Sequence, residues 1–303
     1  MTNDSPHISS ILDNIILPSD PSRSILERKF HLGLWGSSGS GKTRFIASAG
    51  KVPYLSPVLL VDFEGGELTV NSFKYPNISI LRVQELPDFL DKKKSYWETS
   101  LAVLSSIESS IKDYSKFPYN LIGFDGGKVL QDWCEEQVVK ERVAAPSKNS
   151  NDETGNKRDP ELADLGDFRR VASRMADYFW RVKRLPVHTI FTANKRLLQT
   201  EDSTPTNKTY RAGASFFPAT LYEFESCWDV LAYMSSGVNG TRDEYLFETR
   251  LTSRFVAKSR AQGLVPRIVD PDAEKVFSQL KGGAASKSSL AGLNPSSGKE
   301  KTT

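Results

Sequence analysis

The feature that most constrains this 303-residue chain is the segment GSSGSGKT, Gly36 to Thr43, which matches the pattern G-x-x-x-x-G-K-[ST]. The apolar run KFHLGLW precedes it, and a stretch with helical spacing follows from Lys42. A phosphate-binding loop (P-loop) requires this context, because its backbone N–H groups must surround an anion between a strand and a helix. The motif therefore predicts an α/β fold around a parallel sheet.

The residue types of the loop indicate how it would hold ATP together with Mg²⁺. Lys42 would bridge the β- and γ-phosphate oxygens, and the Thr43 hydroxyl would bind Mg²⁺. The candidate nucleotide-binding residues of this segment are Gly36, Ser37, Ser38, Gly39, Ser40, Gly41, Lys42 and Thr43. A glycine- and serine-rich turn that matches by chance is the alternative, which is disfavoured because both flanks agree with the motif.

Two further predicted strands end in carboxylates, which a magnesium site needs besides the loop. Asp125 ends YNLIGFD, whereas Asp62 ends VLLVD and is followed two residues later by Glu64. We assign Asp125 to the water shell of Mg²⁺, and Glu64 to polarising the water that attacks the γ-phosphate. The candidate catalytic residues are thus Lys42, Glu64 and Asp125, and the candidate metal ligands are Thr43 and Asp125. For Glu64 and Asp125, a role in capping a turn stays open.

A fourth predicted strand, VHTIFTAN, ends in the polar residues Thr192 and Asn194. Ligands bind at the carboxyl edge of such sheets, so Asn194 would sense the γ-phosphate or, in the simpler alternative, cap the following turn. Guanine-binding GTPases carry Asn-Lys-x-Asp, but Leu197 stands where that motif has its aspartate. Adenine is therefore the expected base.

Apolar runs of strand length alternate with helical patterns over the central part of the chain. This alternation predicts a mostly parallel twisted sheet with helices on both faces. A C-terminal antiparallel extension is expected, with Asn239-Gly240 at a hairpin tip and RFVAKSR (254–260) as the strand that closes the sheet.

Composition divides the chain into three parts. Residues 1–28 are expected to form an N-terminal arm and linker, with an amphipathic helix over 8–17, and residues 29–280 the α/β domain. Residues 281–303 are rich in Lys, Ser and Gly and are expected to be a disordered tail. Two polar stretches are expected to be surface loops: 144–160 and 195–214.

Charge and cysteine usage exclude several classes of protein. The formal net charge is +3, and the four lysines and one glutamate of residues 281–303 account for it (4 − 1 = +3). Two cysteines and three histidines cannot build a disulfide framework or a zinc cluster of the usual spacing. No apolar run approaches the roughly 18 residues of a membrane span, and the opening lacks the pattern of a signal peptide. We expect a soluble cytoplasmic protein without membrane contact, with both cysteines in its core.

The order of these elements resembles the core-only RecA-like ATPases of phages, a family of phage nucleotide-binding or ATP-dependent single-strand annealing proteins. The elements that carry the resemblance, over roughly residues 29–272, are WGSSGSGKT, VDFEGG, NLIGFD, TIFTAN and FVAKSR. The resemblance implies that Glu64 is the catalytic carboxylate, Asp125 the Walker B acid and Asn194 the sensor. AAA+ ATPases instead usually carry a catalytic glutamate directly after the Walker B aspartate, where this chain has Gly126-Gly127. In the phage RecA-like family, a Ser or Thr is common directly after the Walker B aspartate, whereas this chain has Gly126 there.

The resemblance further implies a homo-oligomer on single-stranded DNA in recombination or annealing, with slow, assembly-dependent ATP hydrolysis and a single-strand-binding protein as a further partner. If a phage encodes the chain, it would act in the host cytoplasm. Basic residues late in such chains reach a neighbour's phosphates, and the candidates are Lys258 and Arg260. Basic residues with one aromatic can follow a phosphate backbone and stack a base. The candidate DNA contacts of this kind are Lys195, Arg196, Lys208, Tyr210 and Arg211. For both sets, an ordinary solvated surface is the alternative.

Two other functions stay open. One is an ATP-dependent switch, or an assembly- or packaging-type ATPase, that acts on a protein partner without DNA and whose turnover DNA would not change. The other is a P-loop protein that binds ATP structurally and hydrolyses nothing, for which the substitution Glu64→Gln would be silent.

Overall fold

The fold is organised around a mixed sheet whose parallel core contains the P-loop strand. The computed structural model describes residues 28–66, 69–71, 74–86, 94–112, 117–144, 163–199, 210–239, 242–261 and 263–282. Within these residues the sheet has ten strands, in the order β10-β8-β7-β1-β5-β4-β2-β3, with β6 paired to β5 and β9 to β7. The strands are β1 (His31–Gly36), β2 (Val58–Asp62), β3 (Ile78–Arg82), β4 (Leu121–Asp125), β5 (His188–Gln199), β6 (Tyr210–Ala214), β7 (Val230–Asn239), β8 (Arg242–Glu248), β9 (Lys258–Ser259) and β10 (Arg267–Val269).

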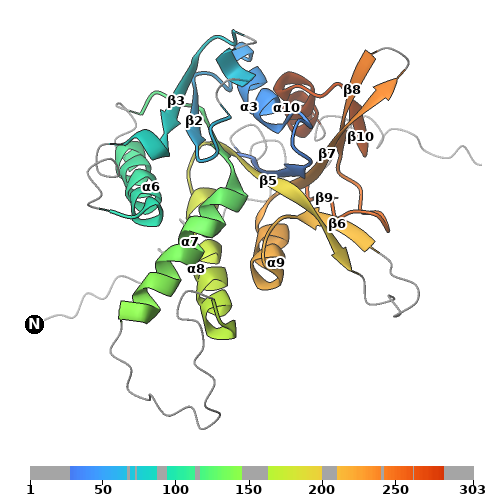
Figure 1. The fold of residues 1–303 in the computed structure, drawn as a ribbon. Helices are drawn as coiled ribbons and strands as arrows, with labels where there is room; N and C mark the ends of the chain where they lie inside the picture. Colours follow the sequence, from blue (N-terminus) through green and yellow to red (C-terminus); the bar gives the residue numbers. More distant parts are fainter. Residues whose placement is uncertain are drawn as a thin grey trace, which may run out of the picture.

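Helices cover both faces of the sheet (Figure 1). One face packs against α6 (Tyr96–Lys112), α7 (Gly127–Ala144), α8 (Leu165–Lys183) and α9 (Pro218–Cys227). The other packs against α3 (Lys42–Ser48) and α10 (Ala273–Gly282). Two short 3-10 helices, η1 (Ala49–Lys51) and η2 (Val83–Glu85), complete the described helices.

The central strands are buried on both faces, which explains their continuous apolar sequences. On β1, Leu32 and Leu34 pack in the core beside α3, whereas Trp35 packs in the core on the opposite face. β1, β2, β3, β4, β5 and β7 run parallel, and β8, β9 and β10 pair antiparallel with their neighbours. The predicted fold class, a mostly parallel sheet with helices on both faces and a C-terminal antiparallel extension, is confirmed.

Local signals set the helix ends. The Asp164 side chain accepts the backbone N–H of Asp167, whose side chain in turn accepts the N–H of Asp164, and this capping box starts α8. Pro218 stands in the first turn of α9, where its missing N–H costs no helical hydrogen bond.

Two predictions about the course of the chain are wrong in part. The predicted loop 195–214 is strand at both ends, because β5 continues to Gln199 and pairs antiparallel with β6. The predicted strand RFVAKSR is extended only over Lys258–Ser259, and β10 rather than this segment forms the edge of the sheet. The side chains of Lys258 and Arg260 are instead held by a helix end, as described below.

Other predictions fall outside the described residues. These are the arm helix over 8–17, the loop 144–160 apart from Ala144 at the end of α7, and the tail from residue 283. Lys281, where the tail was expected to begin, still belongs to α10. Both cysteines are free and buried, as expected. In the described part of the chain, no helix combines the length and the apolarity that crossing a bilayer demands.

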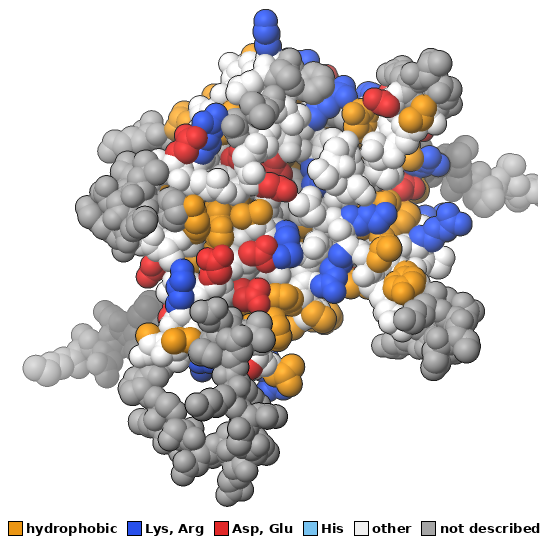
Figure 2. Space-filling model, in the orientation of Figure 1, with side chains coloured by type: hydrophobic (Ala, Val, Ile, Leu, Met, Phe, Trp, Pro, Cys, Tyr) orange, Lys and Arg blue, Asp and Glu red, His pale blue; other side chains and the backbone are white. Residues whose placement is uncertain are grey.

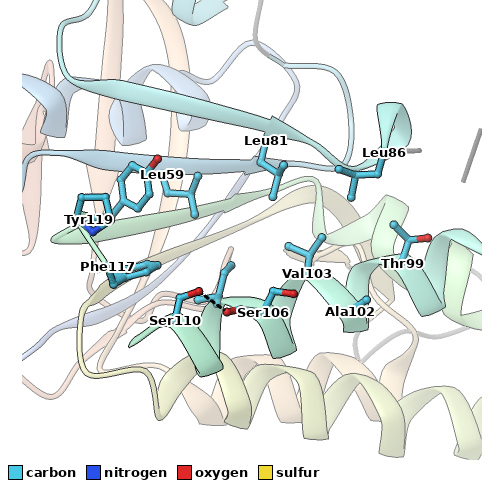
Figure 3. Close-up of a pocket in the computed structure, with 12 residues that line it drawn as sticks. Leu59, Leu81, Leu86, Thr99, Ala102, Val103, Ser106, Ser110, Phe117 and Tyr119 are labelled. Atoms are coloured by element: carbon cyan, nitrogen blue, oxygen red, sulfur yellow. Dashed lines mark hydrogen bonds between the residues drawn. The ribbon is translucent and has the colours of Figure 1, made fainter. Parts of the chain in front are cut away.

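A shallow groove of about 660 Å³ lies between α6 and the edge of the sheet (Figure 3). Leu59 and Leu81 face it from β2 and β3, Val103 faces it from α6, and Phe117 and Tyr119 lie at one end. Its side chains are mostly apolar, and none of them belongs to the P-loop or to the other predicted site residues. The predicted chemistry therefore lies elsewhere in the fold.

Candidate nucleotide-binding site

The carboxyl ends of four parallel strands bring the predicted site residues together. The sheet register places Gly36 beside Asn194, and Asp62 beside Asp125. A cavity of about 370 Å³ opens above these strand ends. It is lined by Ser38, Gly39, Gly41, Lys42, Thr43, Arg44, Glu64, Gly65, Gly66, Thr69, Asp125, Asn194 and Tyr245. One cavity thus contains the P-loop and the side chains that the sequence assigned to metal, water and phosphate.

The P-loop joins β1 to α3 as predicted. Gly39 and Gly41 have φ angles of 75° and 88°, a left-handed conformation that L side chains rarely adopt, so glycine is needed at these positions. Lys42 is buried, and its Nζ donates hydrogen bonds to the carbonyl oxygens of Gly36 (3.1 Å) and Ser37 (2.9 Å). Burial lowers the pKa of Lys42, and the negative charges of Asp125 and Glu64 oppose that lowering. The ammonium group is therefore held within the loop that would receive phosphate.

Asp125 is buried between two hydroxyl groups. Thr43 Oγ1 donates to Asp125 Oδ2 (2.6 Å), and Thr192 Oγ1 donates to Asp125 Oδ1. Burial raises the pKa of this carboxyl, whereas the two hydroxyl donors and Lys42 lower it. Because both carboxylate oxygens are bound by side chains, Asp125 does not cap a turn, and that alternative for Asp125 is not supported.

The oxygen atoms of Thr43 and Asp125 fit a magnesium ion. Mg²⁺ is usually held by one or two carboxylate or hydroxyl oxygens, with waters and substrate phosphates completing its octahedron. Thr43 and Asp125 already lie in contact beside the P-loop. Among the described residues there is no cluster of three or more His, Cys, Asp or Glu side chains that would hold a metal by protein atoms alone. The donor set is therefore suited to a metal that arrives with its nucleotide.

Glu64 and Asn194 both line the cavity and are joined by a hydrogen bond. Asn194 Nδ2 donates to Glu64 Oε1 (3.1 Å), which joins β5, at the point where its pairing with β1 ends, to the turn after β2. The Glu64 side chain is exposed, so water can reach it. Asp62 Oδ1 accepts the backbone N–H groups of Glu64 (3.0 Å) and Gly65 (2.8 Å). Asp62 is thus the carboxylate that caps this turn, whereas the Glu64 carboxylate lines the cavity and accepts the Asn194 amide.

The two glycines after Asp125 leave no room for side chains. Gly126 has a φ of 102°, and a Cβ atom there would lie 2.9 Å from Glu64 Cβ. A Cβ atom on Gly127 would lie 2.5 Å from Phe191 Cε1 and 2.6 Å from the carbonyl oxygen of Thr192. Such distances are too short for real contacts. A carboxylate at this place is therefore sterically disfavoured, and among the described residues Glu64 is the acid that lines the cavity besides Asp125.

Sequence reasoning missed Arg44 and Tyr245. Tyr245 comes from β8 and lines the cavity opposite the carboxylates, and the Arg44 Cζ atom lies 5.2 Å from the centre of its ring. The one sequence signal that placed Arg44 near the site was that it directly follows the P-loop motif. No sequence pattern placed Tyr245 here, because its position depends on the pairing of β8 with β7.

The candidate trans-acting residues lie away from this cavity. Lys258 Nζ and Arg260 Nη2 donate to the carbonyl oxygen of Ser226, at the end of α9 (3.0 and 2.9 Å). Lys258 pairs with Leu231 near the amino end of β7, whereas the P-loop lies at the carboxyl end of β1 beside it. Burial and the neighbouring Arg260 lower the pKa of Lys258 to about 8. Both side chains stabilise a helix C-terminus in this chain.

The candidate DNA contacts lie on the β5–β6 ribbon. Lys195 Nζ donates to the Tyr233 hydroxyl (3.3 Å), and Arg196 Nη1 donates to the carbonyl oxygen of Phe216 (2.8 Å). Tyr210 is 52% exposed, and Arg211 is half-buried. Lys208 lies outside the described residues. The structure thus brings four of the five candidates to one ribbon, two of them with partners in the chain.

The strand order, the P-loop and the carboxylates beside it define a P-loop nucleotide-binding protein. A family model described as an AAA domain matches residues 28–261. The chain therefore belongs to this AAA-domain family. Among solved structures, the chain is similar to a KaiC-like protein, PH0186, from the hyperthermophilic archaeon Pyrococcus horikoshii OT3, at 13% identity and a TM-score of 0.37. That match covers 80% of this chain and 89% of that one. No curated protein matches the chain.

Proposed function

We propose that this protein binds ATP with Mg²⁺ in the P-loop cavity and hydrolyses it, and that the nucleotide controls its binding to single-stranded DNA. The observation that carries the proposal is that Glu64 and Asn194 line the same cavity as Lys42 and the Thr43–Asp125 pair. A γ-phosphate in the P-loop would lie among these groups, because the loop fixes where the phosphates run.

Each side chain has a distinct part in the proposed reaction. Lys42 would turn from the loop carbonyls to the phosphate oxygens and offset charge that develops on them. Thr43 and Asp125 would hold the Mg²⁺ ion and its water, and the metal would supply charge neutralisation between the β- and γ-phosphates. Glu64 would accept a proton from the attacking water, and Asn194 would orient Glu64 and contact the γ-phosphate.

DNA binding is supported by the surface around the ribbon. Lys and Arg side chains gather on the side of β5 and β6, whereas acidic side chains gather over α7 (Figure 2). The exposed ring of Tyr210 offers a surface on which a base could stack. A role in phage-type recombination or annealing, in a homo-oligomer in which Lys258 or Arg260 reaches a neighbour, is part of the same proposal.

A second candidate is a nucleotide switch that acts on a protein partner without DNA. The hydrogen bonds of Lys195 and Arg196 within the chain favour it, because side chains engaged in this way are less available to phosphates. Assembly or packaging would be functions of this kind.

The experiment that separates these candidates is ATP hydrolysis by the purified protein with and without single-stranded DNA, at low and moderate salt. The control variant is Lys42→Ala, which removes the ammonium group from the loop. Stimulation by DNA that disappears in the variant supports the DNA-dependent ATPase. Turnover that DNA leaves unchanged favours the protein-partnered switch, and absence of turnover in the wild-type protein contradicts hydrolysis altogether.

A further inference from the structure

The P-loop cavity has two chemically different walls. Asp125 ends β4, Glu64 lies just after β2, and Asn194 lies in β5 where its pairing with β1 ends. The Tyr245 side chain comes from β8. In the sheet, β4, β2 and β5 lie on one side of β1, and β8 lies on the other side, beyond β7. The P-loop follows β1 and so lies between a polar wall and an aromatic wall.

Tyr245 is fixed against the loop by its surroundings. A Cβ atom on Gly41 would lie 3.1 Å from Tyr245 Cδ1, so the ring packs directly over this glycine of the P-loop. The backbone of Tyr245 is held on both sides, because its N–H donates to Asp270 Oδ1 (3.2 Å) and its carbonyl oxygen accepts the Asp270 N–H (2.7 Å). The wall is therefore part of the rigid sheet and not of a loose loop.

Arg44 adds a cation to the aromatic wall. Its Cζ atom lies 5.2 Å from the centre of the Tyr245 ring, within the range of a cation–π contact. An aromatic ring and a planar guanidinium both offer flat faces on which an aromatic base stacks. The two side chains also belong to the same cavity as Lys42.

We propose that Tyr245 and Arg44 form the subsite for the nucleoside end of the nucleotide, where the aromatic base stacks. The proposal rests on the function proposed above, because the polar wall must hold the γ-phosphate. With the γ-phosphate beside Glu64 and Asn194, a triphosphate that follows the P-loop directs its nucleoside toward the opposite wall. That wall contains Tyr245, and the base meets a flat aromatic and cationic surface there.

The test compares two ligands that share their phosphates, ATP and inorganic tripolyphosphate, each with Mg²⁺, by titration calorimetry on the full chain. Tyr245→Ala is expected to weaken ATP binding about ten-fold or more, the loss typical of one base–aromatic stack, and to leave tripolyphosphate binding unchanged. Tyr245→Phe keeps the ring and is expected to bind both ligands as the wild-type protein does. Arg44→Lys keeps the charge without the planar group, and is expected to weaken ATP selectively. Tyr222→Ala, at a 72% exposed tyrosine of α9, is the matched control and should change neither affinity.

The outcomes separate this proposal from the one on which it rests. If the wild-type protein binds ATP and Lys42→Ala does not, while Tyr245→Ala binds ATP at full affinity, the nucleoside subsite is overturned and the P-loop function stands. Equal loss of both ligands in Tyr245→Ala also overturns the subsite, because the ring would then support the loop and not the base. If the wild-type protein binds neither ligand, the proposed function itself is wrong.

Discussion

Thr192 donates its hydroxyl proton to the buried carboxylate of Asp125, across the pairing of β4 with β5. The same hydroxyl oxygen accepts the backbone N–H of Gly126 (3.1 Å). One side chain therefore orients the proposed magnesium carboxylate and also holds the turn that follows it. A carboxylate fixed in this way does not need to reorganise when a metal arrives.

Replacing Thr192 by Val should destabilise the fold and slow ATP turnover. The substitution keeps the shape but leaves Asp125 Oδ1 and the Gly126 N–H without their buried partner, which costs about 1–3 kcal/mol. Urea denaturation measures this loss. Thr192→Ser keeps the hydroxyl and should retain most of the stability. A Thr192→Val protein as stable as the wild type would show that Asp125 does not depend on this hydrogen bond.

Glu64→Gln should bind ATP nearly as tightly as the wild-type protein and hydrolyse it at least about 100-fold more slowly. The amide keeps the shape of the side chain but cannot accept a proton from water, and a lost general base typically costs 10²–10⁴ in rate. Single-turnover hydrolysis and nucleotide titration measure the two effects separately. Glu85→Gln, at a surface residue paired with Arg82, is the control. Normal turnover in Glu64→Gln would mean that another group is the base.

Gly127→Ala should destabilise the protein by roughly 1–3 kcal/mol, the usual cost of forcing an atom into a packed site. The new Cβ atom would meet the Phe191 ring and a backbone carbonyl oxygen, neither of which can move without disturbing β5. Gly237→Ala in β7 is the matched control, because a Cβ atom there meets nothing within 4 Å. Thermal melts of both variants measure the difference, and equal melting temperatures would contradict the packing argument.

Stability should fall as the pH drops below about 6.5, in part because of His188. Its ring stacks on Phe30, its Nδ1 accepts the Phe30 N–H (3.1 Å), and burial lowers its pKa to about 3. Between pH 6.5 and 3 the unfolded chain binds a proton at this site and the folded chain does not. The free energy of unfolding therefore decreases with falling pH, by up to about 1.4 kcal/mol per pH unit.

The measurement is urea denaturation at pH 7 and pH 5. His188→Asn removes the titrating ring, so its stability should fall less between these two values than that of the wild-type protein. An unchanged pH dependence in the variant would assign the effect to other groups.

The parts of the site that the sequence predicted are those that depend on short segments. The P-loop is a continuous motif, and Glu64, Asp125 and Asn194 each lie at or just after the end of an apolar run in the sequence, so their meeting follows once the strands are parallel neighbours. Their positions agree with the prediction, and their roles stay predictions. The hairpin with Asn239-Gly240 at its tip agrees with the pairing of β7 and β8. Tyr245 was still missed, since its place in the cavity depends on the pairing of β7 with β1 and on the contact with Asp270, which are distant in sequence.

Long-range packing also explains the errors. The alternation in RFVAKSR is typical of a strand, but only two of its residues pair with β7. Lys258 and Arg260 instead donate hydrogen bonds to the carbonyl oxygen of Ser226 near the end of α9. Lys195 and Arg196 look like loop residues by their polarity, yet they extend β5 because β6 returns beside them. In both cases the deciding partner is distant in sequence.

The tight packing around Gly126 and Gly127 limits which substitutions this part of the site can accept. An acid directly after Asp125 would strain this fold, because Glu64 and Phe63 already crowd a Cβ atom at Gly126 and the φ of Gly126 is 102°. Redesign of the turnover rate in this protein is therefore most accessible through the turn after β2 and the end of β5.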